Sequence, residues 1–463
     1  MTYKSVLLFV FDGLRADAFD RALTSGRMPF LTRGLDSSWT RRPLLAALPS
    51  AGPVAHLPAV TGHFPGSLDL PGSAFFAPPK SDLLKGYGER PLRTEPLSLG
   101  EWLPSDKRLL EEIIPEGQSL KSPVPRVPVK VPLWKKILGL STSASWPRTL
   151  QETRLLLQQV RTGFAPPLMI VHLEAPGWLA RNISPQAEEL LEFLSEVDTY
   201  LDEVHQNLTQ SGQVDETAML IVAPFSWGDC VQRKPLEELL HDAGFALAAT
   251  AGKSAIPALC AAVSGTSLAH LCLPDELGRR QALTSEEVLN LCGTAFENLR
   301  AAAEVDHLIT WDKEGQPVIH GASGTARLVQ DGNAYRYTVE GDDPLHRASK
   351  RIEVPLKELL EPSPDDLYPD AFLQLLQLGQ SARRGDILLM SKPTVSLIES
   401  PDQPKSNATG GTLHRDHALG TLLASFPVRE GTLRSADVAP TVLELLGRPL
   451  EGQVDGRTFV RKA

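Results

Sequence analysis

The stretch Ser5-Val6-Leu7-Leu8-Phe9-Val10-Phe11-Asp12-Gly13 decides the fold of this chain. Its apolar run is too short to cross a membrane, but it has the length and composition of a strand buried on both faces of a parallel sheet. Asp12 then lies at the carboxyl end of the strand, where open α/β sheets keep their ligand crevice. The alternative is that Asp12 caps a helix over 13–19, because Asp is a favoured N-cap residue.

Other apolar runs extend this pattern along the chain. They predict strands at 168–174, 218–223, 386–390 and 419–425. Helices are predicted from Ser184 to about 208, after a capping box at Thr284, and from Ser435 to 446. Strands that alternate with helices indicate an α/β fold whose mostly parallel central sheet is flanked by helices on both faces. Short strand-like pieces over about 305–345 predict a small antiparallel β-rich insertion or cap within one domain, 1–463.

Charge, hydropathy and cysteine content indicate which partners and which cellular compartment to expect. The chain has 463 residues and a net charge of -10, without a concentrated block of Lys or Arg, which argues against nucleic acid as a partner. The N-terminus lacks the features of a signal peptide, and no run of about 18 apolar residues follows, so we expect a cytoplasmic protein with no membrane span. Cys230, Cys260, Cys272 and Cys292 show no Cys-x-x-Cys spacing. They indicate buried or half-buried thiols in a reducing compartment, with one disulfide as the less favoured alternative.

Four segments, taken together, carry a family resemblance. They are Val10–Asp17 with Met28–Leu31, Pro49–Gly66, Gly411–Arg415, and Ala436–Gly447 with Asp455-Gly456-Arg457. In order and spacing they resemble the alkaline phosphatase superfamily, and within it the type I phosphodiesterase and nucleotide pyrophosphatase branch. The resemblance implies an alkaline-phosphatase-like fold over nearly the whole chain. It also implies a Thr or Ser nucleophile and two metal ions about 4 Å apart that clamp an in-line displacement at phosphorus.

The residues at the implied catalytic positions depart from that chemistry. Asp12 and His414 match two of the family's metal ligands, but the nucleophile position is Gly52, which has no hydroxyl. The other ligand positions carry side chains that bind no metal: Pro176, Ala180, Pro224 and Phe225. Because one carboxylate or one imidazole cannot hold zinc tightly, the sequence predicts a degenerate metal site and no cofactor.

Three functions remain open from the sequence. The favoured hypothesis is a pseudoenzyme that serves as a binding, regulatory or assembly subunit for protein partners. The alternative is a phosphoric or sulfuric ester hydrolase with zinc or another divalent metal in a rearranged site, built from Asp12, His56, His172, Glu174 and His414. The third is that partner subunits complete the site, with 72–134 as a candidate docking surface, although an ordinary surface excursion is the favoured interpretation of that segment.

Several single residues have two interpretations. Ser50 either replaces the missing nucleophile or caps the helical turn that follows it, which is the favoured role. His56 is expected to make a structural hydrogen bond rather than to act in catalysis. Asp416 and His417 could add ligands, although a solvated polar loop is favoured. Asp198, Asp229 and Asp437 are expected to hold helix starts or turns, while Trp178 and Trp227 are expected to fill the former metal cleft with apolar surface.

Overall fold

The structure is a computed structural model of the chain. It describes residues 2–75, 92–93, 103–104, 106–114, 116–120, 151, 154–155, 157–158, 166–247, 258–274, 282–347, 351–355, 358, 361–398, 405–449 and 452–461. Most of the candidate docking surface at 72–134 therefore lies outside the described residues. Within them, no helix is long and apolar enough to cross a membrane.

The first sheet has seven strands, and β1 (Ser5–Phe11) lies inside it, between β6 (Leu168–Leu173) and β7 (Thr217–Ala223). Both neighbours run parallel to β1, as the apolar runs predicted. The order is β22 (Leu433–Arg434), β2 (Thr40–Leu45), β21 (Leu419–Ala424), β7, β1, β6 and β5 (Gln118–Leu120). Only β21 runs antiparallel to its neighbours, so the prediction of a mostly parallel sheet is confirmed.

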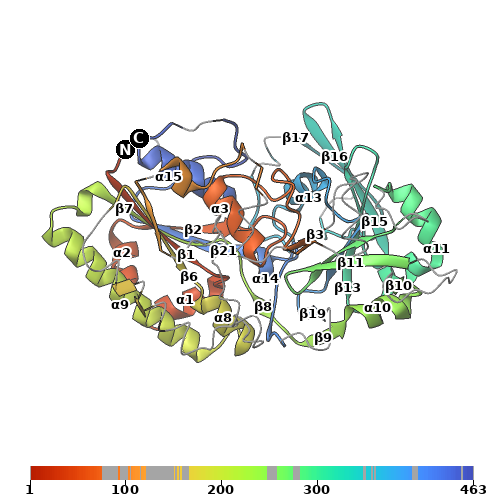
Figure 1. Ribbon diagram of the computed structural model, residues 1–463, viewed down its shortest axis with the longest axis horizontal. Helices are drawn as coiled ribbons and strands as arrows, with labels where there is room; N and C mark the ends of the chain where they lie inside the picture. The colour runs from red at the N-terminus through yellow and green to blue at the C-terminus, as the bar shows by residue number, and fades with distance from the viewer. Residues whose placement is uncertain are drawn as a thin grey trace, which may run out of the picture.

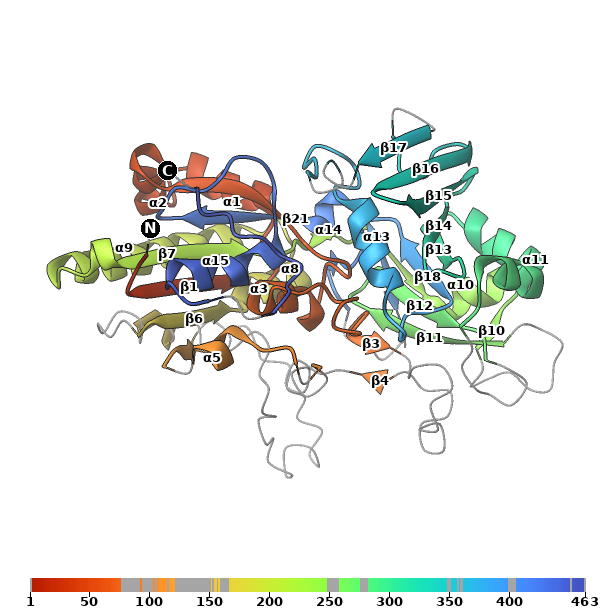
Figure 2. The same cartoon turned by 90° about the horizontal axis from the view of Figure 1, so that it is seen from above.

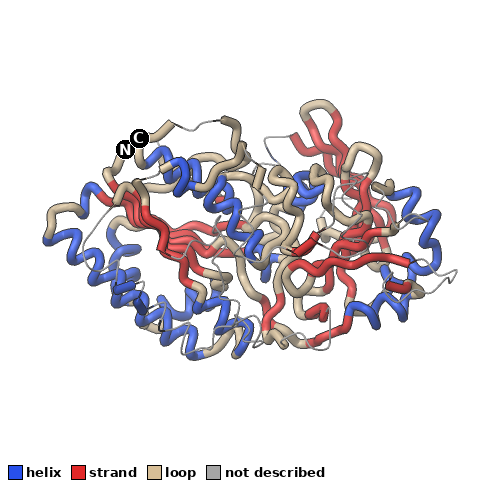
Figure 3. Tube along the Cα trace, viewed as in Figure 1, coloured by secondary structure: helices blue, strands red, loops and turns tan. Residues whose placement is uncertain are grey.

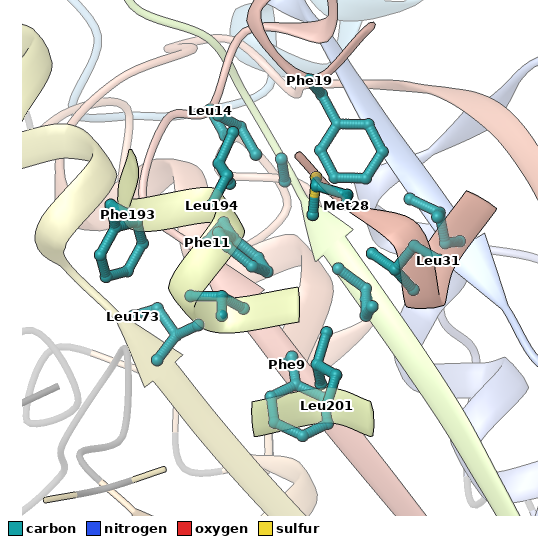
Figure 4. Close-up of a cluster of buried hydrophobic side chains, with 14 of the residues drawn as sticks. Phe9, Phe11, Leu14, Phe19, Met28, Leu31, Leu173, Phe193, Leu194 and Leu201 are labelled. Atoms are coloured by element: carbon teal, nitrogen blue, oxygen red, sulfur yellow. The ribbon is translucent and has the colours of Figure 1, made fainter. Parts of the chain in front are cut away.

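Helices cover both faces of this sheet, as expected for an α/β fold. Alternate residues of β1 explain why: Leu7, Phe9 and Phe11 enter one apolar cluster, while Val6, Leu8 and Val10 enter another. Figure 4 shows Phe9 and Phe11 packed with side chains of the helices on the first face. Those helices are α1 (Ala16–Thr24), α2 (Pro29–Ser37), α8 (Ala175–Asn182) and α9 (Glu188–Gln210). The second face packs against α3 (Leu57–Thr61), α5 (Leu110–Ile113) and α15 (Val438–Leu445).

A second sheet of nine strands lies beside the first along the long axis of the molecule (Figures 1 and 2). Its order is β10 (Ala246–Leu247), β11 (Ala258–Ser264), β12 (Leu268–Cys272), β18 (Ile387–Ser391), β13 (Val305–Trp311), β14 (Pro317–His320), β15 (Gly324–Asp331), β16 (Ala334–Gly341) and β17 (Arg351–Pro355). Helices α10 (Leu236–Ala243), α11 (Ser285–Ala301) and α13 (Ala371–Gly379) belong to the same half.

The second sheet shows that one predicted strand was assigned to the wrong sheet and that the predicted antiparallel segment is larger than expected. Strand β18 was expected in the central sheet, but it pairs with β12 and β13. The error arises because a buried apolar run predicts a strand without indicating which sheet it joins. The strand-like pieces at 305–345 do form strands, yet the antiparallel sheet that contains them extends well beyond that segment. Among the described residues there are also three short two-stranded pairs: β3 (Ala74–Phe75) with β4 (Leu92–Arg93), β8 (Gly228–Asp229) with β20 (Ala408–Thr409), and β9 (Gln232–Pro235) with β19 (Val395–Ile398).

Helix starts test the capping predictions. The capping box is confirmed at Thr284, whose hydroxyl accepts a hydrogen bond from the backbone N–H of Glu287. Ser184 does not begin α9, because its hydroxyl instead accepts the N–H of Gln186 in a turn and the helix starts at Glu188. Ser435 lies inside a 3-10 turn, η4 (Ser435–Asp437), and is not the cap of α15. In the part of the chain that the structure describes, three further short elements are η1 (Pro53–His56), η3 (Val214–Glu216) and α14 (Arg415–Ala418). Figure 3 shows how helices and strands divide between the two halves of the molecule.

Candidate functional site

Asp12 lies at the carboxyl end of β1 and is only 7% exposed. It does not cap the next helix, because α1 begins at Ala16 with Arg15 at the N-cap position. Its Oδ1 is hydrogen-bonded to Nε2 of His56 at 3.3 Å, and its Oδ2 lies 3.6 Å from Nη2 of Arg181. Asp12 therefore lies at the end of the strand where the sequence placed it, and the side chains of His56 and Arg181 contact it there.

The surroundings of Asp12 favour its charged form. Burial alone would raise the pKa of this carboxyl, but the hydrogen bond from His56 and the charge of Arg181 outweigh it and lower the pKa to about 2. A carboxylate that is buried, ionised and paired in this way stabilises the folded chain at neutral pH.

Replacing Asp12 by Asn tests that pairing. Because the pKa of Asp12 is depressed from 3.8 to about 2 on folding, its contribution is complete above pH 3.8 and is lost as the pH falls through about 2. We expect Asp12→Asn to lower the free energy of unfolding by about 2 kcal/mol at pH 7. Denaturant unfolding at several pH values should show the gap from the wild type narrowing below about pH 4.

Asp202→Asn is the matched control, because this carboxylate pairs with Arg33 at the exposed surface. Its effect should stay below about 1 kcal/mol. A cost for Asp12→Asn that does not change between pH 6 and pH 3 would contradict a role for the ionised carboxylate.

His172 and Glu174 extend the cluster, as their alternation along one strand predicted. The imidazole rings of His56 and His172 meet edge to face with centroids 4.8 Å apart. Nδ1 of His172 lies 3.8 Å from Oε1 of Glu174. The structure thus brings four of the five residues of the predicted rearranged site together at the ends of β1 and β6.

His414 belongs to a different cluster. Its ring packs edge to face on Tyr368 at 5.8 Å, and its Nδ1 accepts the N–H of Asp416 at the start of α14. Burial lowers the pKa of His414. Across the described part of the chain, no group of three or more His, Cys, Asp or Glu side chains is arranged to hold a metal ion. The donor set around Asp12 therefore does not fit the two-metal centre that the resemblance implies.

The turn after His414 differs from the polar loop expected there. Residues 415–418 form the short helix α14, and His417 is completely buried. Its Nδ1 is bonded to Thr412 Oγ1 at 2.8 Å, while its Nε2 lies 3.0 Å from the carbonyl oxygen of Pro393. Burial lowers the pKa of His417 to about 3. Both ring nitrogens are occupied by protein atoms, so His417 supports the backbone rather than a metal.

Two aromatic rings pack beside Asp12. Phe225 is fully buried and Trp227 is 2% exposed, and they pack with alanines from five separate segments. The ring of Phe225 meets His56 at 5.2 Å, and the guanidinium of Arg181 lies over the indole of Trp227 at 5.1 Å. Trp227 lies beside Asp12, whereas Trp178 packs against the apolar cluster between the central sheet and the helices α1, α2, α8 and α9.

Two glycines make this close packing possible. A Cβ atom at residue 13 would lie 2.1 Å from Cδ1 of Trp227, and one at residue 177 would lie 2.1 Å from Oδ2 of Asp12. Residues four apart share one face of a helix. The face of α8 that approaches Asp12 at Gly177 therefore also carries Arg181, whose guanidinium pairs with the Asp12 carboxylate. Sequence reasoning missed Arg181 as the partner of Asp12. The only available signal was its place four residues after a glycine on the helix that follows β6.

The nucleophile segment offers no free hydroxyl. Gly52 has φ +73° and ψ -171°, a backbone conformation that is essentially restricted to glycine. The Ser50 hydroxyl donates to the carbonyl oxygen of Thr412 at 2.6 Å and is 1% exposed. Ser50 therefore joins the nucleophile segment to the loop that carries His414, which is neither of the two roles considered for it.

Two of the three acidic residues expected to hold helix starts or turns, Asp198 and Asp437, do so. Asp198, on α9, accepts the N–H groups of Phe30 and Leu31 in the first turn of α2. Asp437 accepts the N–H groups of Arg434 and Arg457. Asp229 lies 3.3 Å from Arg15. Asp198 and Asp437 thus support backbone turns of the scaffold, whereas Asp229 makes a side-chain ion pair.

A cavity of about 680 Å³ lies beside the cluster that contains His414. Asp306 and His307 line it, and both contact Tyr368, the residue on which His414 packs. Its volume falls in the range of small-molecule pockets. Neither Asp12 nor its neighbours line this cavity.

The comparisons with known proteins agree with this fold. Human ectonucleotide pyrophosphatase / phosphodiesterase 5 superposes with a TM-score of 0.59 at 11% identity, and its murine counterpart with 0.56 at 10%. Each alignment covers 98% of this chain and 97% of the other. An inactive variant of the murine protein in complex with AMP gives a TM-score of 0.56. At such identities the likeness shows the fold alone, which confirms the alkaline-phosphatase-like architecture.

Sequence comparison adds the family. No curated protein sequence matches the chain. The family model described as type I phosphodiesterase / nucleotide pyrophosphatase matches residues 6–417, which is most of the chain. Three of the four segments quoted from the sequence lie within this match, and this chain belongs to the type I phosphodiesterase / nucleotide pyrophosphatase family.

Proposed function

We propose that this protein is a catalytically inactive member of its family, a pseudoenzyme that serves as a binding, regulatory or assembly subunit for protein partners. One observation carries the proposal. The Asp12 carboxylate, which would ligate a metal in an active relative, is paired with Arg181 and His56 beneath two buried aromatic rings. A guanidinium in contact with that carboxylate supplies the positive charge that a metal would otherwise bring.

The chemistry of ester cleavage supports the same proposal. Enzymes of phosphate ester hydrolysis must lower very high barriers, and most of that stabilisation comes from charges placed around the reacting phosphorus. This chain has glycine at the nucleophile position and apolar or proline side chains at four ligand positions. Its remaining candidates, Asp12 and His414, lie in separate clusters. A binding or assembly role needs none of these groups.

The test is metal content together with turnover, on protein purified without chelator. We expect less than about a tenth of a zinc ion per chain, because zinc needs three or four protein ligands. We also expect no cleavage of bis(p-nitrophenyl) phosphate or p-nitrophenyl sulfate with added zinc, magnesium or manganese. One or two ions per chain, lost in the Asp12→Ala, His414→Ala double variant, would overturn the proposal in favour of the rearranged hydrolase.

Restoring the nucleophile is a separate prediction. Because the backbone at Gly52 has φ +73°, Gly52→Thr should lower the free energy of unfolding by about 1–3 kcal/mol through backbone strain. It should not create turnover of the same esters, since the metal ligands are still missing. Urea unfolding and the ester assays measure the two expectations. Turnover that appears in Gly52→Thr and disappears when Asp12→Ala is added would show that a hydroxyl alone was missing.

We also infer a cytoplasmic location. Cys260, Cys272 and Cys292 are buried, Cys230 is half-buried, and no disulfide joins any of the four. These cysteines support the reducing compartment that the sequence indicated. Fractionation of cells that express the full chain would test the inference, and recovery of the protein outside the cytoplasm would overturn it.

A further inference from the structure

Two of the four cysteines face each other across a strand pair. In the antiparallel register of β11 and β12, Cys260 is the direct partner of Cys272. Directly opposed residues on antiparallel strands have Cα atoms about 4.5–5.5 Å apart and point to the same face of the sheet. A disulfide spans Cα separations of about 4.4–6.8 Å. The strand pairing thus places both thiols where a disulfide can form without rearrangement of the sheet.

Among the residues that the structure describes, small apolar side chains pack against this pair. Cys260 and Cys272 are 8% and 4% exposed and form an apolar cluster with Ala74 and Ala262. Alanine neighbours leave the sulfur atoms room to rotate toward each other, which bulky side chains would prevent.

The segment 71–75 covers the same face of the sheet. The carbonyl oxygen of Pro71 lies 3.0 Å from Nε2 of His270, and the N–H of Ser73 donates to Ser264 Oγ at 2.9 Å. Both His270 and Ser264 lie on the face that carries the two cysteines, two and four residues along their strands. The two cysteines therefore lie directly beneath segment 71–75, which follows the nucleophile segment in the chain.

The other two cysteines are placed differently. Cys292 lies on α11 in a separate apolar cluster, where burial raises the pKa of its thiol to about 12. Cys230 lies between β8 and β9 and is half-buried. Neither has a cysteine as its partner in the strand register, and all four cysteines lie within the described residues.

We propose that Cys260 and Cys272 form a reversible dithiol/disulfide pair, a redox-responsive clamp on the β11–β12 hairpin. The oxidant is a small disulfide of the glutathione class. The thiolate of one cysteine attacks oxidised glutathione, which forms a mixed disulfide and releases one glutathione thiolate. The thiolate of the second cysteine then attacks the protein sulfur of that mixed disulfide and releases the second glutathione. Two protein thiols are oxidised to one disulfide, and one glutathione disulfide is reduced to two glutathione thiols, which take up the two protons that the protein thiols lose.

The proposal does not depend on the absence of catalysis. In a reducing compartment the pair remains a dithiol, and a shift to oxidising conditions closes a covalent loop around the hairpin turn. Closing that loop restricts the unfolded chain, so the oxidised protein should melt at a higher temperature than the reduced one.

The experiment incubates the folded full chain with reduced or with excess oxidised glutathione, followed by acid quenching, denaturation and alkylation with N-ethylmaleimide. Intact-mass analysis should find four maleimide adducts on the reduced protein and loss of the two from Cys260 and Cys272 after oxidation. Peptide mapping should then recover a Cys260–Cys272 crosslink. Glutathione bound to Cys230 is distinguished by its added mass.

The variants separate the pair from the other cysteines. Cys272→Ala and Cys272→Ser should form no internal crosslink and show no rise in melting temperature on oxidation. Cys292→Ser, which keeps the pair, should form the same crosslink as the wild type. The proposal is overturned if the folded wild type keeps all four alkylatable thiols under oxidised glutathione, or if the crosslink joins Cys230 or Cys292 instead.

Discussion

Replacing Arg434 by Met is expected to lower the free energy of unfolding by about 3–5 kcal/mol, because it leaves a buried carboxylate without its counter-charge. The Arg434 guanidinium binds both oxygens of Asp370, at 2.7 and 2.6 Å. The side chains are 10% and 1% exposed. Because both side chains are buried, water cannot solvate the charge that remains when the other is removed. Removal of one charge therefore lowers the free energy of unfolding far more than it would at the surface.

This ion pair joins the two halves of the molecule. Asp370 precedes α13 in the half that contains the nine-stranded sheet, and Arg434 lies on β22 at the edge of the first sheet. Gln374 and Gln377 of α13 continue the connection, because their side chains hydrogen-bond the N–H and the carbonyl of Leu48 at the start of the nucleophile segment. We therefore expect Arg434→Met to loosen that segment as well as to destabilise the fold.

Denaturant unfolding of Arg434→Met beside Arg33→Met is the measurement. Arg33 makes an ion pair with Asp202 at 3.1 Å, but its side chain is 62% exposed, so the same substitution there should cost less than about 1 kcal/mol. Adding Asp370→Asn to Arg434→Met removes the stranded charge and should restore part of the loss. Equal costs for the two single variants would refute a role for burial.

The sequence predicted local features well because they depend on neighbouring residues. The apolar run before Asp12 and the alternation of His172 and Glu174 each follow from the period of a strand. The capping box at Thr284 follows from residues three apart. These patterns were sufficient to place Asp12, His172 and Glu174 together, because the carboxyl ends of adjacent parallel strands lie at one edge of a sheet.

Features that depend on distant partners could not be predicted in the same way. The run that became β18 looked like a strand of the central sheet, since apolar composition carries no information about pairing partners. His414 was grouped with Asp12 from the family resemblance, whereas the structure packs it on Tyr368. Arg181 as the counter-charge of Asp12 required the orientation of α8, which only the tertiary structure supplies.

Trp227→Ala is expected to lower the free energy of unfolding by about 3–5 kcal/mol, the usual cost of deleting a large buried aromatic ring. The reason is the burial of the indole ring. An aromatic side chain that lines a hydrated substrate cleft buries little of its surface, but the indole of Trp227 is 2% exposed. It packs against Phe225 at 5.8 Å and against the glycine backbone at residue 13.

Trp227→Phe is the matched control, because it keeps an aromatic ring while removing the indole N–H, which is buried and has no hydrogen-bond partner among the described residues. Removing a buried, unsatisfied donor offsets part of the lost contact, so this variant should cost much less than Trp227→Ala. Chemical denaturation of both variants measures the difference. A near-zero cost for Trp227→Ala would mean that the ring borders an open, hydrated cleft, and would remove the main support for a crevice converted into core. If the ring fills buried space beside Asp12, Trp227→Ala should lower the free energy of unfolding strongly and Trp227→Phe only slightly. That result would mean that apolar burial, and not a specific polar contact, holds together the two segments around Asp12.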